Sequence, residues 1–472
     1  MVIIFLIGYT VIALEHPLKI DKAASAMFMG VMLWIIFILG AREILPMGLS
    51  DAWNSFQQST TFATFLKSHP NPTFDTTANY FIGEYEIIKH LGEISEIIFF
   101  LLAAMIIVEL IDQYNGFALI TDRIKTTSKR KLLWILCILT FLMSAGLDNL
   151  TTTIVLIALV RKLVSEKKDR WLFASMIVLS SNAGGVWSPI GDVTTILLWI
   201  GGQITAANIV TNVALPGLVS FVVPVLLISP FIKGEVVRPN PKREHHHNIS
   251  PFEQKLVFWT GLCSLLFVPF FKAFVHLPPF MGRLLGLSII WLMTEIIHQR
   301  MPIKVRKEFS VYTALKRIDI PTVFFFLGIL MGVSALQSAG HLKILSVFLN
   351  NEFGNVYIIN LIIGVLSSLI DNVLLVAAAI GTYGVVPESA LATAHNAAYL
   401  SNFVQNGTFW EFLAYTSGTG GSILIIGSAA GVAAMGMEKI DFIWYLKKIS
   451  WLAVVGYLVG AGVYYLERVF FM

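Results

Sequence analysis

Apolar runs of about 20 residues recur from one end of the chain to the other, and they limit the possible folds more than any other feature. A helix of that length crosses roughly 30 Å of hydrocarbon. Only 13% of the 472 residues are charged, and the runs leave no room for a large soluble domain. The sequence therefore predicts an all-α integral membrane protein.

The charge balance and the cysteines exclude several classes of partner and site. Thirty-three Lys and Arg against 29 Asp and Glu leave a net charge of only +4, which argues against nucleic acid as a partner. Cys137 and Cys263 both lie inside apolar runs, so neither a disulfide framework nor a cysteine metal site is predicted. Membrane lipid is the expected partner, and no cofactor is expected.

A first re-entrant hairpin is predicted at residues 132–160. Basic residues flank this segment on both sides, namely Arg123, Lys125, Lys129, Arg130 and Lys131 before it and Arg161, Lys162, Lys167, Lys168 and Arg170 after it. Because basic loops stay in the cytoplasm, the segment should enter and return on that side, with its tip at residues 144–149. Each arm of about 15 residues is too short to span the membrane.

A second hairpin is predicted at residues 355–386, with its tip at residues 367–372. Its flanks hold Glu352 and Glu388 and no Lys or Arg, so it should enter from outside. The basic loops 233–255 and 299–317 are then both cytoplasmic. This assignment places both termini outside the cytoplasm.

An internal repeat supports the two hairpins. The run from Glu96 to Met105 resembles the run from Thr322 to Met331, and Gly184-Gly185 matches Gly420-Gly421. By the loop count the repeats are inverted, which in transporters places the substrate at the repeat interface near the membrane midplane. Four regions are predicted: N-terminal spans with a periplasmic amphipathic loop (1–92), repeat 1 with a broken helix at 172–200 (93–232), a cytoplasmic loop with connecting spans (233–318), and repeat 2 with a broken helix at 409–436 (319–472).

Few ionisable residues lie within the apolar runs. Asp148, Asp192 and Asp371 each stand alone in theirs, and an intramembrane carboxylate is by default a functional hypothesis. The alternative is a structural acid that caps a helix break. Asp-Asn at each tip (Asp148-Asn149 and Asp371-Asn372) offers oxygen ligands that suit an alkali cation. Asp319, directly before the start of another run, is predicted as a helix N-cap.

The broken segments complete the set of candidate residues. Glycines, a proline and polar side chains interrupt the runs at residues 180–195 and 416–422. Unwound backbone at membrane depth is tolerated where it lines a cavity or is buried in protein, although the glycines alone could serve close helix packing.

These strings resemble those of a known family. Ser181-Asn-Ala-Gly-Gly-Val-Trp-Ser-Pro-Ile-Gly-Asp-Val-Thr-Thr195, Leu147-Asp-Asn-Leu-Thr-Thr-Thr153 and Gly418-Thr-Gly-Gly-Ser-Ile-Leu-Ile-Ile-Gly-Ser428 are similar to motifs of the NhaD family of bacterial Na⁺(Li⁺)/H⁺ antiporters. The resemblance implies a scaffold domain and a transport domain that moves like an elevator, a homodimer, and a bacterial inner membrane. It also implies ion-binding or proton-carrying positions, here Asp148, Asn149, Asn182, Asp192, Thr194, Thr195, Ser367 and Asn372, together with hydroxyls of the region 419–428, here Thr419, Ser422 and Ser428. Asp371 and Ser417 are added to this set as polar residues of the interrupted runs. The Na⁺ or Li⁺ ligands among them are Asp148, Asn149, Asn182, Asp371 and Asn372.

The favoured function is exchange of cytoplasmic Na⁺ or Li⁺ for external H⁺ by alternating access, with buried carboxylates that bind either cation or proton. Na⁺-coupled symport of a dicarboxylate or another anion is the alternative. Acids at both tips would repel an anion, and the sequence places no Arg or Lys near a tip. An intramembrane hydrolase is disfavoured because no Gly-x-Ser-x-Gly elbow is present, so the chain is not expected to be an enzyme.

Overall fold

The computed structural model describes residues 1–13, 18–121, 123–237, 249–299, 309–369, 372–392, 394 and 396–471, and the regular elements in these ranges are helices. Seven of these helices are long and apolar enough to cross a membrane, or eight if the bent pair α15 (Pro251–Leu266) and α16 (Val268–Val275) is one span. A helix can cross because it satisfies its backbone polar groups internally. The chain is therefore a multi-pass integral membrane protein, as predicted.

The chain divides into two compact units. The first comprises residues 1–98, 319–355 and 373–385, and the second comprises residues 99–318, 356–372 and 386–472. The long helix α8 (Ile87–Gln113) passes from the first unit to the second at Phe99. The four regions predicted from the sequence remain predictions.

The first unit is built on the close pair α3 (Lys22–Leu39) and α20 (Ile320–Ser338). A β-carbon at Gly30 would overlap the carbonyl oxygen of Gly328, so glycine lets the two backbones touch. Asp319 caps α20, as predicted, and its carboxylate accepts a hydrogen bond from Thr322 Oγ1 at 2.6 Å. The other described elements of this unit are α1 (Val2–Ala13), α4 (Ala41–Ile44), η1 (Leu45–Met47), α5 (Asp51–Gln57), α6 (Thr60–Ser68), α7 (Phe74–Asn79), the π-helical η2 (Tyr80–Glu86) and α21 (His341–Phe353).

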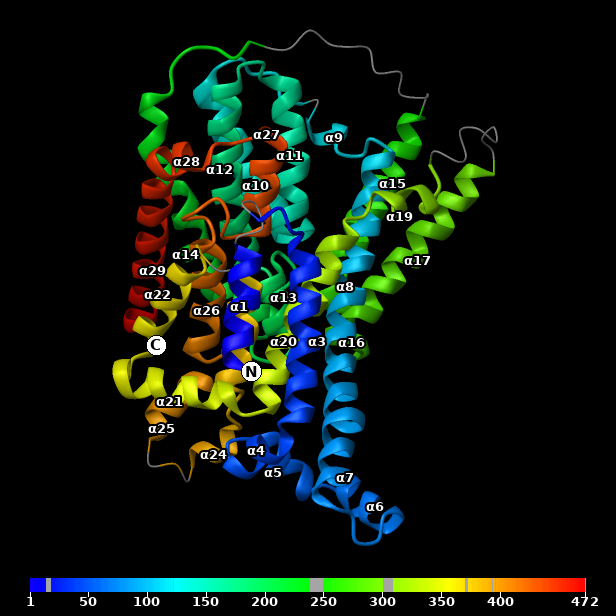
Figure 1. Ribbon diagram of the computed structural model, residues 1–472. Helices are drawn as coiled ribbons and strands as arrows, with labels where there is room; N and C mark the ends of the chain where they lie inside the picture. The colour runs from blue at the N-terminus through cyan, green and yellow to red at the C-terminus, as the bar shows by residue number, and fades with distance from the viewer. Residues whose placement is uncertain are drawn as a thin grey trace. The chain divides into compact units, whose positions relative to one another are not determined.

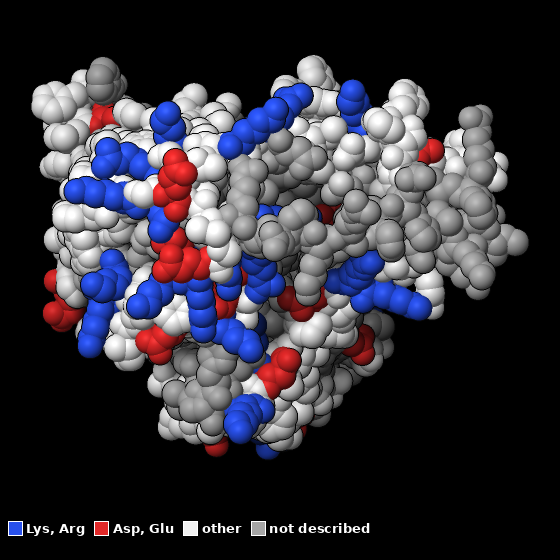
Figure 2. Space-filling model, turned by 90° about the horizontal axis from the view of Figure 1, so that it is seen from above, with Lys and Arg blue, Asp and Glu red and all other residues white. Residues whose placement is uncertain are grey.

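The second unit contains the first predicted hairpin segment. Helices α10 (Lys129–Leu147) and α11 (Asn149–Leu163) are separated only by Asp148. The outer ends of both helices meet the same segment, since Lys129 N donates to Gly234 O at 3.2 Å and Ser165 N donates to Val237 O at 2.9 Å. The basic residues on both flanks therefore lie at one end of the unit. Figure 2 views the molecule from this end and shows many Lys and Arg side chains.

Both predicted broken helices are present in the second unit. The first consists of α12 (Lys167–Gly185) and α13 (Val193–Ile200), and the second of α26 (Thr408–Gly420) and α27 (Ala429–Glu438). Figure 1 shows α12 and α27 at the upper end of this unit and α13 and α26 below them. Glu438 forms ion pairs with Arg161 and Arg170 at the upper end, at 2.6 and 2.9 Å. The two broken helices thus run in opposite directions.

The second predicted hairpin segment holds α22 (Val356–Leu366) and α23 (Asn372–Tyr383). The side chain of Asn360 on α22 donates to Phe409 O at 3.2 Å, so α22 begins at the lower end, where α26 also begins. This is the opposite end from the one where α10 begins. From Val373 onward α23 belongs to the first unit.

Equivalent contacts recur in the two halves of the second unit. Ser144 Oγ donates to Ser181 O at 2.6 Å, and Ser367 Oγ donates to Ser417 O at 2.7 Å. The members of the second pair lie 223 and 236 residues after those of the first. The same two offsets relate the contact of Gly184 with Phe141 O to that of Gly420 with Gly364 O, where a β-carbon would overlap the oxygen in both cases. This recurrence supports the predicted repeat.

A second helix pair and an apolar cluster complete this unit. Helices α14 (Ala206–Ile228) and α29 (Ser450–Phe471) pack along each other. The cluster joins Leu147 to Leu265 and Leu287, and also to Ala103 and Ala104 of α8. The remaining described elements are α9 (Ala118–Thr121), η3 (Ser229–Phe231), α17 (Pro279–His298), α19 (Val311–Arg317), α24 (Glu388–Leu391), α25 (Ala397–Leu400), η4 (Ser401–Phe403) and α28 (Phe442–Lys448).

Candidate functional site

The first helix break lies at Asp148, whose backbone has φ +76° and ψ 160°. This region is almost restricted to glycine and costs about 1–3 kcal/mol. The side chain offsets part of that cost as the N-cap of α11, because its carboxylate accepts from Thr151 N and Thr151 Oγ1, both at 2.8 Å. Asp148 thus both ends α10 and starts α11.

Polar caps also mark the breaks in the two long helices. Asp192 caps α13 and accepts from Thr194 N at 3.1 Å, and Thr195 completes a capping box. Ser428 caps α27 and accepts from Gly431 N at 3.2 Å. Asp192 and Ser428 are equivalent positions of the repeat, 236 residues apart. The polar side chains of Asp192 and Ser428 therefore lie at the breaks of the two broken helices, where each second helical segment begins.

One buried hydrogen-bond network joins four of the predicted site residues. Asn149 Nδ2 donates to Asn182 Oδ1 at 3.0 Å and to Asp192 Oδ2 at 2.9 Å. Asn372 Nδ2 lies 3.4 Å from the same Asp192 oxygen. All four side chains are at most 4% exposed. Both hairpin segments and the first broken helix therefore converge on one carboxylate.

Asn182 extends this network to the second broken helix. Its Nδ2 donates to Ser422 Oγ and to Ser428 Oγ, each at 2.9 Å. Both serines are buried. Predicted residues of the two halves, far apart in the sequence, thus share one set of hydrogen bonds.

The other predicted residues lie around this network. Ser367 and Ser417 bond to each other as described above, and the Thr419 hydroxyl bonds to Tyr415 O within its own helix at 2.5 Å. Thr194 Oγ1 is buried, and no described residue bonds to it. The predicted ligand Asp371 lies outside the described residues.

The Asp148 carboxylate contacts its own helix start rather than the network, and it interacts electrostatically with Arg283 of α17. Arg283 is 2% exposed, lies 4.3 Å from the ring centroid of Phe100, and its Nε has no hydrogen-bond partner in the described chain. The expectation that no Arg or Lys lies near a tip is therefore wrong for the first tip. The sequence hid this neighbour because Arg283 lies 135 residues after Asp148 and reaches it only through packing of α15 and α17 beside the tip.

The chemistry of the network suits a small hard cation. Such cations prefer carboxylate, amide and hydroxyl oxygens, and the network supplies all three kinds together with backbone carbonyls freed at the breaks. The buried Thr194 hydroxyl beside Asp192 and the Thr152 hydroxyl on α11 both lack a partner among the described residues. A cation could bind to these two hydroxyl oxygens without breaking a hydrogen bond to another described residue.

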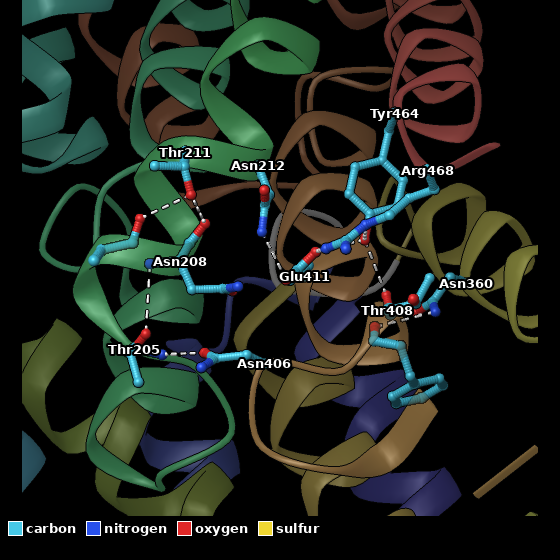
Figure 3. Close-up of polar contacts among 12 residues, drawn as sticks. Thr205, Asn208, Thr211, Asn212, Asn360, Asn406, Thr408, Glu411, Tyr464 and Arg468 are labelled. Atoms are coloured by element: carbon cyan, nitrogen blue, oxygen red, sulfur yellow. Dashed lines mark hydrogen bonds and ion pairs between the residues drawn. The ribbon is translucent and has the colours of Figure 1, made fainter. Parts of the chain in front are cut away.

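A second buried charged cluster lies at the lower end of α26, and the sequence reasoning missed it (Figure 3). Glu411 is fully buried and forms an ion pair with Arg468 of α29. Its two oxygens also accept from Asn212 of α14 at 3.0 Å and from Tyr464 of α29 at 2.8 Å. Nearby, Asn406 Oδ1 accepts from Thr205 N at 2.7 Å. The position of Glu411 inside the apolar run 409–436 was a signal that could have identified it.

Known proteins similar to this chain fit the arrangement. The family model described as citrate transporter matches residues 5–404. Sodium/proton antiporter 1 of Arabidopsis thaliana is 41% identical over 98% of this chain and 71% of its own length. Sodium/proton antiporter 2 of the same plant is 39% identical over 98% of both chains. The Na⁺/H⁺ antiporter NhaD of Vibrio cholerae is 26% identical over 97% of this chain and 89% of its own.

Proposed function

Because this chain belongs to the citrate transporter family and is similar to Na⁺/H⁺ antiporters that include one of the NhaD type, we propose that it exchanges cytoplasmic Na⁺ or Li⁺ for external H⁺. Its sodium/proton antiporter relatives support Na⁺/H⁺ exchange in particular. The observation that carries the proposal is the buried network around Asp192, which brings groups from both halves of the second unit onto one carboxylate.

The transported cation binds to oxygens of this network. The Asp192 carboxylate and the Thr194 hydroxyl both belong to the start of α13, and the amide oxygens of Asn149 and Asn182 are within the same network. Asp148, Asn372 and Asp371 belong to the proposed ligand set, Asp371 on the pattern of the sequence alone. A carboxylate that binds Na⁺ cannot hold a proton at the same time, so one pool of acids couples the two fluxes.

In this proposal the two inverted repeats exchange conformations, so that the site opens alternately to each side of the membrane. The equivalent contacts at Ser144 and Ser367 and the opposite directions of the two broken helices support two inverted repeats. The repeats form a scaffold domain and a transport domain that moves like an elevator, in a homodimer. The basic flanks at one end support a cytoplasmic position for that end, with both termini outside the cytoplasm. The proposed location in a bacterial inner membrane rests on the resemblance to bacterial antiporters.

Collapse of a pH gradient in everted vesicles tests the function. Addition of Na⁺ or Li⁺ should dissipate ΔpH, whereas K⁺ or citrate should not, and vesicles that carry Asp192→Asn should not respond. Dissipation by citrate with Na⁺, and not by Na⁺ alone, would overturn the antiporter in favour of anion symport.

The dependence of kinetics on pH tests the shared carboxylates. Below the pKa of the competing acids, each unit of falling pH should raise the apparent KM for Na⁺ roughly tenfold per competing proton while the maximal rate stays constant. A KM that does not change with pH would contradict a shared site.

A further inference from the structure

Two adjoining cavities in the second unit lie along the exposed face of α10. The larger has a volume of about 810 Å³ and is almost wholly apolar, with Leu142, Met143, Gly146 and Leu147 of α10 in its wall. The smaller, about 530 Å³, is lined by Ile135 and Leu139 of α10 and by Arg123 and Lys125. Ile120 lines both. Because the α10 residues follow one another at helical spacing, the two cavities lie one after the other along this helix, and we refer to them together as the α10 path.

The basic end of this path is free to bind an anion. Arg123 and Lys125 are exposed, and within the described part of the chain neither forms an ion pair or a side-chain hydrogen bond. They lie just before the start of α10, at the end of the unit where the basic flanks gather. Basic pockets between membrane helices on the cytoplasmic side bind anionic lipid head groups.

The length of the apolar part matches a lipid tail. From Ile135 to Leu147 the helix rises about 18 Å, close to the roughly 15 Å that one leaflet of a 30 Å hydrocarbon core occupies. The opposite wall is apolar as well, with Phe117, Phe258, Leu262 and Leu266. A soluble anion would use only the basic end, whereas a phospholipid would use both ends.

We propose that an anionic phospholipid binds along α10, with its phosphate between Arg123 and Lys125 and one acyl chain in the large apolar cavity. The end of the acyl chain then contacts Gly146 and Leu147, directly before the break at Asp148. The bound lipid covers the apolar surface beside the first hairpin tip. Binding is measured without transport, so its failure leaves the exchange proposal untouched.

Lipid binding to the delipidated full-length protein tests this site, with native mass spectrometry as the readout. Phosphatidylglycerol should bind more tightly than phosphatidylcholine with the same chains. The double variant Arg123→Gln/Lys125→Gln should bind phosphatidylglycerol roughly 30-fold more weakly, which corresponds to about 1 kcal/mol per basic residue. The matched control Lys447→Gln/Lys448→Gln removes the same charge from exposed positions of α28 and should stay within twofold of wild type.

The apolar part is tested separately. Leu142→Trp fills the large cavity and should reduce binding of both lipids, whereas Ile138→Trp, on the exposed face of the same helix but outside both cavities, should not. If both double variants lost phosphatidylglycerol affinity equally, the effect would come from net charge alone, and this result would contradict the proposed site. Displacement of phosphatidylglycerol by inorganic phosphate at equal concentration, with unchanged binding in Leu142→Trp, would also overturn it in favour of a free-anion site.

Discussion

At the scale of single residues, the two acids at the breaks of the first half have different neighbours. Asp192 accepts hydrogen bonds from two asparagine side chains, whereas Asp148 accepts from the first turn of its own helix and interacts electrostatically with Arg283. Only Asp192 is enclosed by the network. Replacing either acid should abolish exchange, but the two replacements should change the stability of the protein by different amounts.

Asp192→Asn is expected to abolish exchange while the protein still inserts, because the amide keeps the shape and cannot titrate. ΔpH dissipation in vesicles of matched protein content measures the effect. Asp319→Asn is the matched control, since asparagine also caps a helix, and it should retain exchange. Wild-type rates in Asp192→Asn would assign this acid to structure.

Asp148→Asn is expected to abolish exchange and also to lower stability by about 1–2 kcal/mol, because it removes the opposite charge that interacts with the buried Arg283. Thermal unfolding in detergent measures this. The double variant Asp148→Asn/Arg283→Gln should recover most of the stability and none of the exchange. If the single and double variants unfold at the same temperature, Arg283 does not depend on Asp148.

At the scale of elements, close approach of backbones sets where the broken helices can lie. Gly420→Ala should destabilise by about 1–3 kcal/mol, because its β-carbon would overlap Gly364 O and push α26 away from α22. Gly436→Ala on α27 is the matched control, since no atom lies within 4 Å of the added β-carbon, and alanine there should raise stability by about 0.5–1 kcal/mol. Thermal unfolding of both variants decides; a stable Gly420→Ala would show that the two helices can separate at no cost.

The Glu411 cluster holds three helices together, α14, α26 and α29. Glu411→Gln should cost about 3 kcal/mol because it removes the charge that pairs with Arg468, whose side chain is 8% exposed. Asp51→Asn breaks the exposed pair with Lys343 and should change stability by under about 1 kcal/mol. In unfolding experiments, the double variant Glu411→Leu/Arg468→Met should be more stable than Glu411→Gln; the reverse order would mean that the polar network itself is the stabilising feature.

At the scale of the whole molecule, inverted repeats require that the two hairpin segments open to opposite sides. In a variant with Cys137 and Cys263 replaced by Ala, a cysteine at Lys167 should be labelled by an impermeant maleimide from the cytoplasm and one at Glu388 from outside. The physical reason is that basic loops remain in the cytoplasm. Labelling of both positions from the same side would contradict the inversion.

Local features of the sequence predict the class of the protein and the places where its helices break. Apolar runs, the glycines at 184–185 and 420–421, the cap Asp319 and the hairpin tip at Asp148 are local features, and the structure has the corresponding helix ends at these residues. Such signals can be read from the sequence because a cap or a breaker acts on its own neighbouring backbone within one turn.

Which of these residues come into contact depends on how the helices pack, and local sequence features do not show it. Asn149, Asn182, Asp192, Asn372 and the serines of the second half are joined by hydrogen bonds across separations of 33 to 246 residues. Arg283 beside Asp148 and Arg468 on Glu411 were not predicted, because an arginine in or beside an apolar run carries no sign of which distant acid it faces. Hydrocarbon makes an isolated charge costly, so each buried ion needs a partner, and helix packing alone decides which one lies within reach.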